Sequence, residues 1–226
     1  MKNLTAIMCA LSEEFDAIKT VFQFDSLKQD DDHKNFWHAT LDDRNYIIAV
    51  SHIGCINASV TASKLCIQYQ PGNMIFCGIA GAISNKLKVG DVIIPDNAFY
   101  VESVSHESFA DLWDAPNPDL ALHSANLDMN LYCIDNNTVS QATVATSDVF
   151  PAPEKSLNAC YDKNATIIDM ETYPAAFVAK HFNVPFYCVR SVSNAIDTHE
   201  IPDNALSISA MNAAIVAKQM ILQLGL

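Results

Sequence analysis

One segment, residues 166–197, constrains the fold of this chain more than any other. It reads TIIDMETYPAAFVAKHFNVPFYCVRSVSNAID. A short apolar run precedes a helix of small residues, and a second apolar run, Phe186–Val189, leads into the polar stretch Arg190–Asn194. Buried strands that deliver polar groups at their carboxyl ends are where α/β folds build binding sites. The segment therefore predicts an α/β fold with a ligand site at this end of a sheet.

The rest of the chain repeats this alternation of short apolar runs and amphipathic helices. We expect strands at 4–11, 36–41, 46–51, 74–77, 92–94, 99–101, 139–146 and 166–168, helices at 12–22, 57–69, 174–182 and 205–224, and irregular segments at 26–34, 106–130 and 147–150. Strands that alternate with helices predict a three-layer αβα sandwich, with a central mixed, twisted sheet and helices on both faces.

Composition narrows the class of protein. A chain of 226 residues that is 50% hydrophobic is expected to form one domain over residues 1–226. The net charge of −13 and the lack of any Lys/Arg cluster argue against nucleic acid and against an anionic membrane surface as partners. No apolar run approaches the roughly 18 residues of a membrane span. The seven cysteines and seven histidines show no metal-ligand spacing, which predicts reduced thiols in the cytoplasm and no bound metal.

Six short motifs follow one another in the order of a known enzyme group. They are AIMCALSEEF, SHIGCINAS, IFCGIAGAI, LKVGDVIIPDNAFY, TSDVF and the IIDMET…VRSVSN segment. In that order they resemble IGAMEEE, SGIGKVAA, a Gly-Ser-Ala-Gly-Gly loop, LKVGDIVVSDEARY, SGDAF and VEME…VRxISD of the nucleoside phosphorylase/nucleosidase superfamily. The nearest resemblance is to bacterial methylthioadenosine/S-adenosylhomocysteine nucleosidases. It implies that superfamily's fold, a purine nucleoside as ligand, no cofactor, and a homodimer in which residues near 100–118 face the second subunit.

The same resemblance implies roles for individual residues. Glu14 matches the carboxylate that activates the attacking water, and a carboxylate at a strand-to-helix junction can accept a water proton. Glu171 matches the carboxylate that binds the ribose hydroxyls, with Met170 packing against the sugar. Phe150 matches an aromatic residue that stacks on the base, and Pro151 offers backbone groups to the base edge. The structural alternatives are first-turn helix acids for the two carboxylates and an ordinary core position for Phe150.

Asn194 departs from the family pattern, which places a proton-donating Asp there. An amide cannot give up a proton at neutral pH. Its NH2 can donate to O6 of a 6-oxopurine while its carbonyl accepts from a protonated N7, whereas adenine presents a mismatched amino group. Asn also stands at this position in the superfamily's 6-oxopurine phosphorylases and futalosine hydrolases. Asp197 is a substitute acid that the family pattern disfavours, and Ser193 is counted among the substrate-binding residues.

Water is the expected nucleophile. Phosphorolysis needs a cationic cradle, usually built from Arg. The chain has two arginines, Arg44 and Arg190, and neither Lys nor Arg occurs within residues 65–85. The glycine-containing segment in that stretch therefore lacks a neighbouring cation in the sequence, and Ile79 replaces a small polar family residue within it. Arg190 matches a family Arg that is expected to brace the loop around the base.

Three functions remain open from the sequence. The first is hydrolysis of the N-glycosidic bond of a 5′-modified purine ribonucleoside, of the methylthioadenosine/S-adenosylhomocysteine type, which the overall similarity favours. The second is a 6-oxopurine nucleosidase of the futalosine hydrolase type, which Asn194 favours. The third is a catalytically impaired nucleoside-binding protein. Glu14 and Glu171 argue against the third, since a protein that only binds has no use for a water-activating carboxylate.

Overall fold

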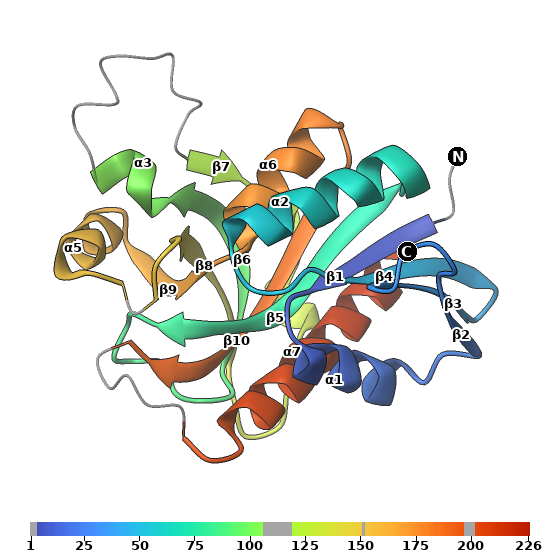
Figure 1. The fold of residues 1–226 in the computed structure, drawn as a ribbon. Helices are drawn as coiled ribbons and strands as arrows, with labels where there is room; N and C mark the ends of the chain where they lie inside the picture. The colour runs from blue at the N-terminus through green and yellow to red at the C-terminus, as the bar shows by residue number, and fades with distance from the viewer. Residues whose placement is uncertain (1–3, 106–118, 151, 197–201) are drawn as a thin grey trace.

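The computed structural model describes residues 4–105, 119–150, 152–196 and 202–226. The first elements are β1 (Leu4–Cys9), α1 (Ser12–Phe22), β2 (Ser26–Gln29), β3 (Phe36–Leu41), β4 (Arg44–Val50), α2 (Cys55–Lys64) and a π-helical turn (Leu65–Tyr69). Then follow β5 (Asn73–Ala82), β6 (Val92–Tyr100), α3 (Val101–Ser105), β7 (Asp119–Ala121), two 3-10 turns (His123–Asn126, Met129–Leu131), β8 (Val139–Thr146), α5 (Glu154–Asp162), β9 (Ala165–Asp169), α6 (Thr172–His181), β10 (Phe186–Ala195) and α7 (Ala205–Leu224). Figure 1 shows the sheet between two sets of helices.

The strands form one mixed sheet, part of which closes into a ring. β5 pairs in parallel with β10, β10 antiparallel with β6, and β6 in parallel with β8. β8 pairs in parallel with β9, and β9 returns antiparallel to β5. The remaining strands extend the sheet from β5 in the order β1, β4, β3 and β2. The predicted mixed α/β fold is confirmed. The predicted three-layer sandwich is not, because the central sheet closes like a barrel over five of its strands.

Irregularities in three strands account for the closure. The register shifts between Val192 and Asn194 in β10, between Pro95 and Asn97 in β6, and between Ala165 and Ile167 in β9, which pair with the consecutive residues Thr143 and Val144 of β8. Each such bulge bends its strand and increases the local right-handed twist. The bent strands bring β9 back to the carboxyl-terminal end of β5, which completes the ring.

Two helices cover each face of the sheet. α1 buries Phe15, Ile18 and Phe22, spaced three and four residues apart, against a cluster that it shares with α7. On the opposite face, α2 and α6 bury small side chains such as Ala62 and Ala179 in a second cluster. Small residues let these helices approach the sheet closely.

α7 is apolar along most of its length. Among the described residues it is the one helix long and apolar enough, by length and composition alone, to cross a membrane. A buried core helix meets the same criteria, and α7 packs against α1, β5 and β10. Its buried side chains include Ala213, Ala217 and Ile221, which belong to the same core cluster as β1 and β5.

The ring places several strand ends beside one another. β1, β5 and β10 run parallel, so their carboxyl ends lie on the same side of the sheet. β9 meets β5 where Ile168 pairs with Gly81, and the chain beyond Ile168 therefore runs back along β5. This crossing brings the polar residues that follow β9 toward the middle of β5.

Candidate active site

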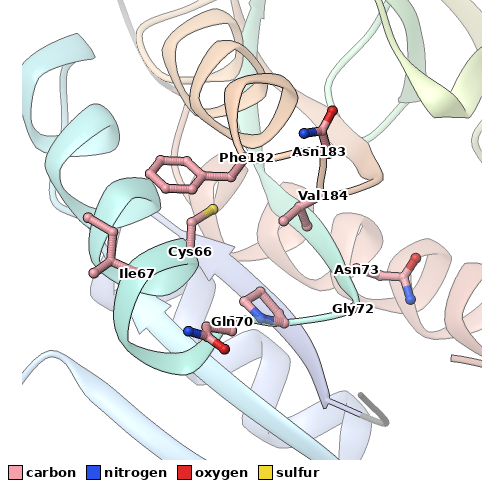
Figure 2. A pocket seen from close by; sticks show the side chains of 9 residues that line it. Cys66, Ile67, Gln70, Gly72, Asn73, Phe182, Asn183 and Val184 are labelled. Atoms are coloured by element: carbon pink, nitrogen blue, oxygen red, sulfur yellow. The ribbon is translucent and has the colours of Figure 1, made fainter. Parts of the chain in front are cut away.

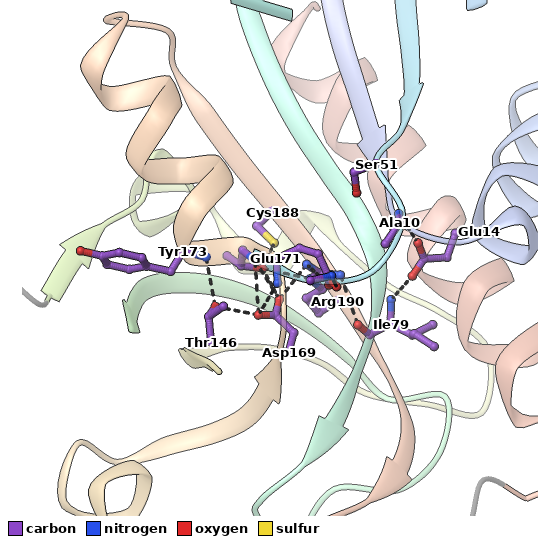
Figure 3. Close-up of polar contacts among 12 residues, drawn as sticks. Ala10, Glu14, Ser51, Ile79, Thr146, Asp169, Glu171, Tyr173, Cys188 and Arg190 are labelled. Carbon is purple, nitrogen blue, oxygen red and sulfur yellow. Dashed lines mark hydrogen bonds and ion pairs between the residues drawn. The ribbon is translucent and has the colours of Figure 1, made fainter. Parts of the chain in front are cut away.

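Arg190 lies at the centre of a buried polar cluster (Figure 3). Among the residues that the structure describes, it is the bulkiest fully buried side chain, with 1% of its surface exposed. Its Nη2 lies 2.7 Å from Oδ2 of Asp169 and 3.5 Å from Oε2 of Glu171. Its Nε donates to Oγ1 of Thr172 at 3.0 Å, and its guanidinium carbon lies 4.1 Å from the ring centroid of Phe76. A buried charge must be paired in this way, because its desolvation alone costs several kcal/mol.

Gly78 leaves the space in which two charged groups meet. Arg190 on β10 is in register with Gly78 on β5. A Cβ on Gly78 would lie 2.5 Å from Oε1 of Glu14 and 2.6 Å from Nη1 of Arg190. The need for glycine here is spatial, because the charged atoms occupy the volume that a side chain would fill.

Glu14, on α1, connects the loop after β1 to β5. Its residue is 2% exposed, and its Oε2 accepts hydrogen bonds from the N–H groups of Ala10 at 2.7 Å and Leu11 at 2.9 Å. Its Oε1 accepts from the N–H of Ile79 at 2.8 Å. The bond to Leu11 also satisfies a free N–H at the start of α1. Burial raises the pKa of Glu14, although Arg190 and the three N–H groups oppose that rise.

Glu171 lies on the other side of Arg190. It immediately precedes α6 and is 5% exposed. Its Oε1 accepts from the N–H of Gly54 at 3.0 Å, which connects it to the start of α2. Burial raises the pKa of Glu171 and the nearby charge of Asp169 adds to the rise, whereas Arg190 lowers it. Two buried carboxylates with raised pKa values thus flank one guanidinium.

Asp169 has a larger structural role than the sequence suggests. Besides its ion pair with Arg190, its Oδ1 accepts from Oγ1 of Thr146 at 2.7 Å and from the N–H of Glu171 at 3.3 Å. It also accepts from the hydroxyl of Thr172. An acidic residue directly at the end of an apolar strand is the sequence signal for this role.

Asn194 lies near the carboxyl-terminal end of β10. It is 3% exposed, and its Oδ1 accepts from Oγ of Ser193 at 2.9 Å while its Nδ2 donates to the carbonyl of Ala195 at 3.3 Å. Ser193 occupies the bulge in β10, and its Oγ lies 3.3 Å from the carbonyl of Ala80. Ser193 therefore orients the amide. Asp197, the alternative acid, lies outside the described residues.

The remaining predicted site residues lie on loops and strand ends. Phe150 is 49% exposed, so the alternative of an ordinary core position is wrong. The loop that carries it, residues 147–150, is tied to β9 because the N–H of Ser147 donates to the carbonyl of Asp169 at 2.9 Å. Met170 is partly buried between Asp169 and Glu171 in the chain. Pro151 lies outside the described residues.

A cavity of about 770 Å³ lies at the amino end of β5, away from this cluster (Figure 2). Its lining consists of Cys66, Ile67, Gln70, Pro71, Gly72, Asn73, Phe182, Asn183 and Val184. None of these residues belongs to the Arg190 cluster, so converging polar groups and not cavity size mark the candidate site. In the described part of the chain, no three His, Cys, Asp or Glu residues are grouped to hold a metal.

Residues 5–222 match the family model described as the phosphorylase superfamily. The chain belongs to this family. A methylthioadenosine/S-adenosylhomocysteine nucleosidase of Staphylococcus aureus (strain MRSA252) is 27% identical over 169 residues, which cover 72% of this chain and 74% of that protein.

Solved structures share the fold over nearly the full length. One is a Helicobacter pylori nucleosidase variant, with an aspartate replaced by asparagine and 5′-methylthioadenosine in its active site. Its TM-score is 0.86 at 20% identity, covering 99% of this chain and 100% of that one. A futalosine hydrolase from the same organism has a TM-score of 0.82 at 20% identity, covering 97% of each chain.

For a member of the phosphorylase superfamily, the position of any cation near β5 matters. The glycine-containing segment 78–81, which has no neighbouring cation in the sequence, has one in the fold, because Nη1 of Arg190 donates to the carbonyl of Ile79 at 3.2 Å. Arg190 also lies between Glu14 and Glu171, whereas the sequence placed it against the loop around the base. Its three nitrogens are all engaged with protein acceptors, so the guanidinium offers a phosphate little free donor capacity.

We predict that Gly78→Ala destabilises the protein. The added methyl would push Glu14 and Arg190 out of their buried positions, at a cost of about 1–3 kcal/mol. Urea unfolding midpoints measure this effect. Gly81→Ala is the matched control, because a Cβ there would meet its nearest neighbours at an ordinary 3.7 Å. Equal midpoints for the two variants would contradict the steric argument.

Proposed function

We propose that this chain is a purine nucleosidase that hydrolyses the N-glycosidic bond of a 5′-modified purine ribonucleoside, of the methylthioadenosine/S-adenosylhomocysteine type. The observation that carries the proposal is the pair of buried carboxylates, Glu14 and Glu171, on either side of Arg190. The names of the relatives support the same reaction class. The site lies within one domain spanning residues 1–226.

In this proposal Glu14 activates the attacking water. An ionised carboxylate has about four lone-pair sites, and three N–H groups already bind this one. One site remains for a water, whose proton Glu14 accepts as the water oxygen bonds to C1′ and the bond from C1′ to the base breaks. The raised pKa of Glu14 suits it to receive that proton.

Glu171 binds the ribose hydroxyls in the same proposal. Within the described part of the chain, its Oε1 accepts one hydrogen bond, from the N–H of Gly54, and its Oε2 lies at the limit of hydrogen-bond distance from Arg190. The carboxylate therefore keeps acceptor sites for a vicinal diol. Met170 packs against the sugar, Ile79 makes the adjacent part of the site apolar, and Phe150 stacks on the base.

Asn194 supports a second candidate, a 6-oxopurine nucleosidase of the futalosine hydrolase type. The Ser193 hydroxyl donates to the side-chain carbonyl of Asn194. This bond fixes the orientation of the amide, with its NH2 group on the side away from the Ser193 hydroxyl. An NH2 donor pairs with O6 of a 6-oxopurine but not with the 6-amino group of adenine. The two candidates share the water-activating machinery and differ in the base that they release.

We further propose that the chain acts as a homodimer in the cytoplasm, within methionine salvage. Exposed apolar side chains on the neighbouring helices α2 and α6 support a dimer surface, among them Ile56 at 79%, Val60 at 51% and Phe177 at 41% exposure. All seven cysteines are free thiols, which suits a reducing compartment. Equilibrium sedimentation of the purified chain tests the dimer.

Free-base release tests the proposed reaction. Chromatography of incubations with methylthioadenosine, S-adenosylhomocysteine, inosine, guanosine and futalosine identifies the base that is released. We expect release that is independent of phosphate, with the free sugar (ribose or the 5′-substituted ribose of the substrate) rather than its 1-phosphate as the second product, because the Arg190 nitrogens are engaged. The sugar 1-phosphate as the main product would identify a phosphorylase.

Glu14→Gln should lower kcat by about 10²–10⁴, the usual contribution of general acid–base catalysis, while nucleoside binding persists. Single-turnover rates and calorimetric titration separate the two effects. Glu13→Gln is the matched control, since Glu13 is an exposed neighbour that bonds to the hydroxyl of Ser12. Unchanged turnover in Glu14→Gln would remove Glu14 from the mechanism.

Asn194→Asp separates the two candidate substrates. A carboxyl group in place of the amide supplies a proton donor for N7, so release of adenine should rise, by up to about 10²–10⁴. With a 6-oxopurine nucleoside the same change should slow release, because a carboxylate would oppose the lone pairs of O6. Rapid adenine release by the wild type that falls in the variant would show that another group protonates N7.

A further inference from the structure

The loop that carries Phe150 is fastened to the end of β6 and the start of α3. We name residues 147–150 the base loop. Oε1 of Glu102 accepts from Oγ of Ser147 at 2.7 Å and from the N–H of Asp148 at 3.2 Å. The hydroxyl of Tyr100 donates to Oδ2 of Asp148. Two side chains from one segment therefore hold the base loop from the same side.

Ser147 is the central residue of this connection. It is 1% exposed, and its hydroxyl donates to Glu102 while lying 3.2 Å from the N–H of Val149, from which it accepts. Its own N–H donates to the carbonyl of Asp169 at 2.9 Å. The residue thus links β9, Glu102 and the backbone just before Phe150.

The Ser147 hydroxyl belongs to this chain and not to the family pattern. The motif TSDVF resembles SGDAF, in which glycine stands where this chain has Ser147. Glycine has no hydroxyl to donate to Glu102. Tyr100 and Asp148 match residues of the family motifs, so the hydrogen bond between these two side chains fits that pattern. The hydrogen bond from Ser147 to Glu102 is the one that this chain adds.

The side chain of Glu102 is held mainly by its hydrogen bonds to the base loop. Its second oxygen, Oε2, is buried and has no hydrogen-bond partner among the described residues. Its first oxygen accepts from both Ser147 and Asp148. Hydrogen bonds to a charged acceptor contribute more than neutral ones, so the loss of Ser147 is expected to loosen both the carboxylate and the base loop.

We infer that Ser147 and Glu102 are positioning residues that hold the base loop ready to receive the purine base. The inference rests on the proposed function, since the base is the ligand of this loop. Phe150 is half exposed and has to be fixed in place to form a stacking surface. A loop that is ordered before binding avoids the entropy cost of ordering it on binding. The effect falls on base affinity and leaves Glu14 untouched.

Three variants, Ser147→Ala, Glu102→Ala and their combination, test this role. Each single change should weaken the calorimetric affinity for free adenine or hypoxanthine, and raise KM, by about five- to tenfold, with kcat nearly constant. The double variant should bind the free base only slightly less tightly than the single variant with the lower affinity, because both substitutions remove the same hydrogen bond between Ser147 and Glu102. Glu102→Gln keeps an acceptor oxygen and should restore most of the affinity. Ser140→Ala, on the same strand β8, is the matched control and should behave as wild type.

Hydrogen exchange gives a readout independent of activity. The amides of Asp148 and Val149 bond to Glu102 and Ser147, so both should exchange faster in Ser147→Ala. Wild-type base affinity in Ser147→Ala would overturn the inference, with or without faster exchange. Failure of the wild type to release base from any nucleoside would instead overturn the proposed function, and the two failures are therefore distinguishable.

Discussion

The buried charge of Arg190 is the constraint on which the rest of the site depends. A guanidinium with 1% exposure needs partners on every side, and it finds them on segments that are distant in the chain. Asp169 and Glu171 follow β9, and the carbonyl of Ile79 belongs to β5. The ring of five strands brings these segments together, so the closure of the sheet and the pairing of the charge support each other.

The same charge sets the chemical character of the two carboxylates. Burial raises the pKa values of Glu14 and Glu171, and Arg190 limits the rise by favouring their ionised forms. Under the proposed function, these two groups would serve as the water-activating base and the sugar-binding carboxylate. Asn194, which the proposal places at the leaving base, is an amide held by Ser193 and not an acid. The proposed site would therefore activate the nucleophile through Glu14 and recognise the base through an amide.

The sequence predicted the elements whose signals are local. The bounds of α1 and α7 agree with the 12–22 and 205–224 helices, because one apolar face recurs along each. β2, α3, β7 and α5 were missed. α3 and β7 are only five and three residues long, β2 is exposed throughout, and α5 buries only Ser156 and Cys160. β5 was predicted to end at Cys77 but continues to Ala82, because pairing with β10 and β9 sustains a glycine-containing stretch that reads as a loop.

By itself, the sequence determined the α/β class and the alternation of elements, which follow from periodicity. It also supplied the motif order, and the resemblance to the family that this order carries singled out Glu14, Glu171 and Asn194. Only the tertiary structure decided that the sheet closes, that Arg190 lies between the two carboxylates, and that Asp169 and Ser147 hold their neighbours in place. Those outcomes depend on bulges and on pairings between distant strands, whose free energy exists only once the segments have met.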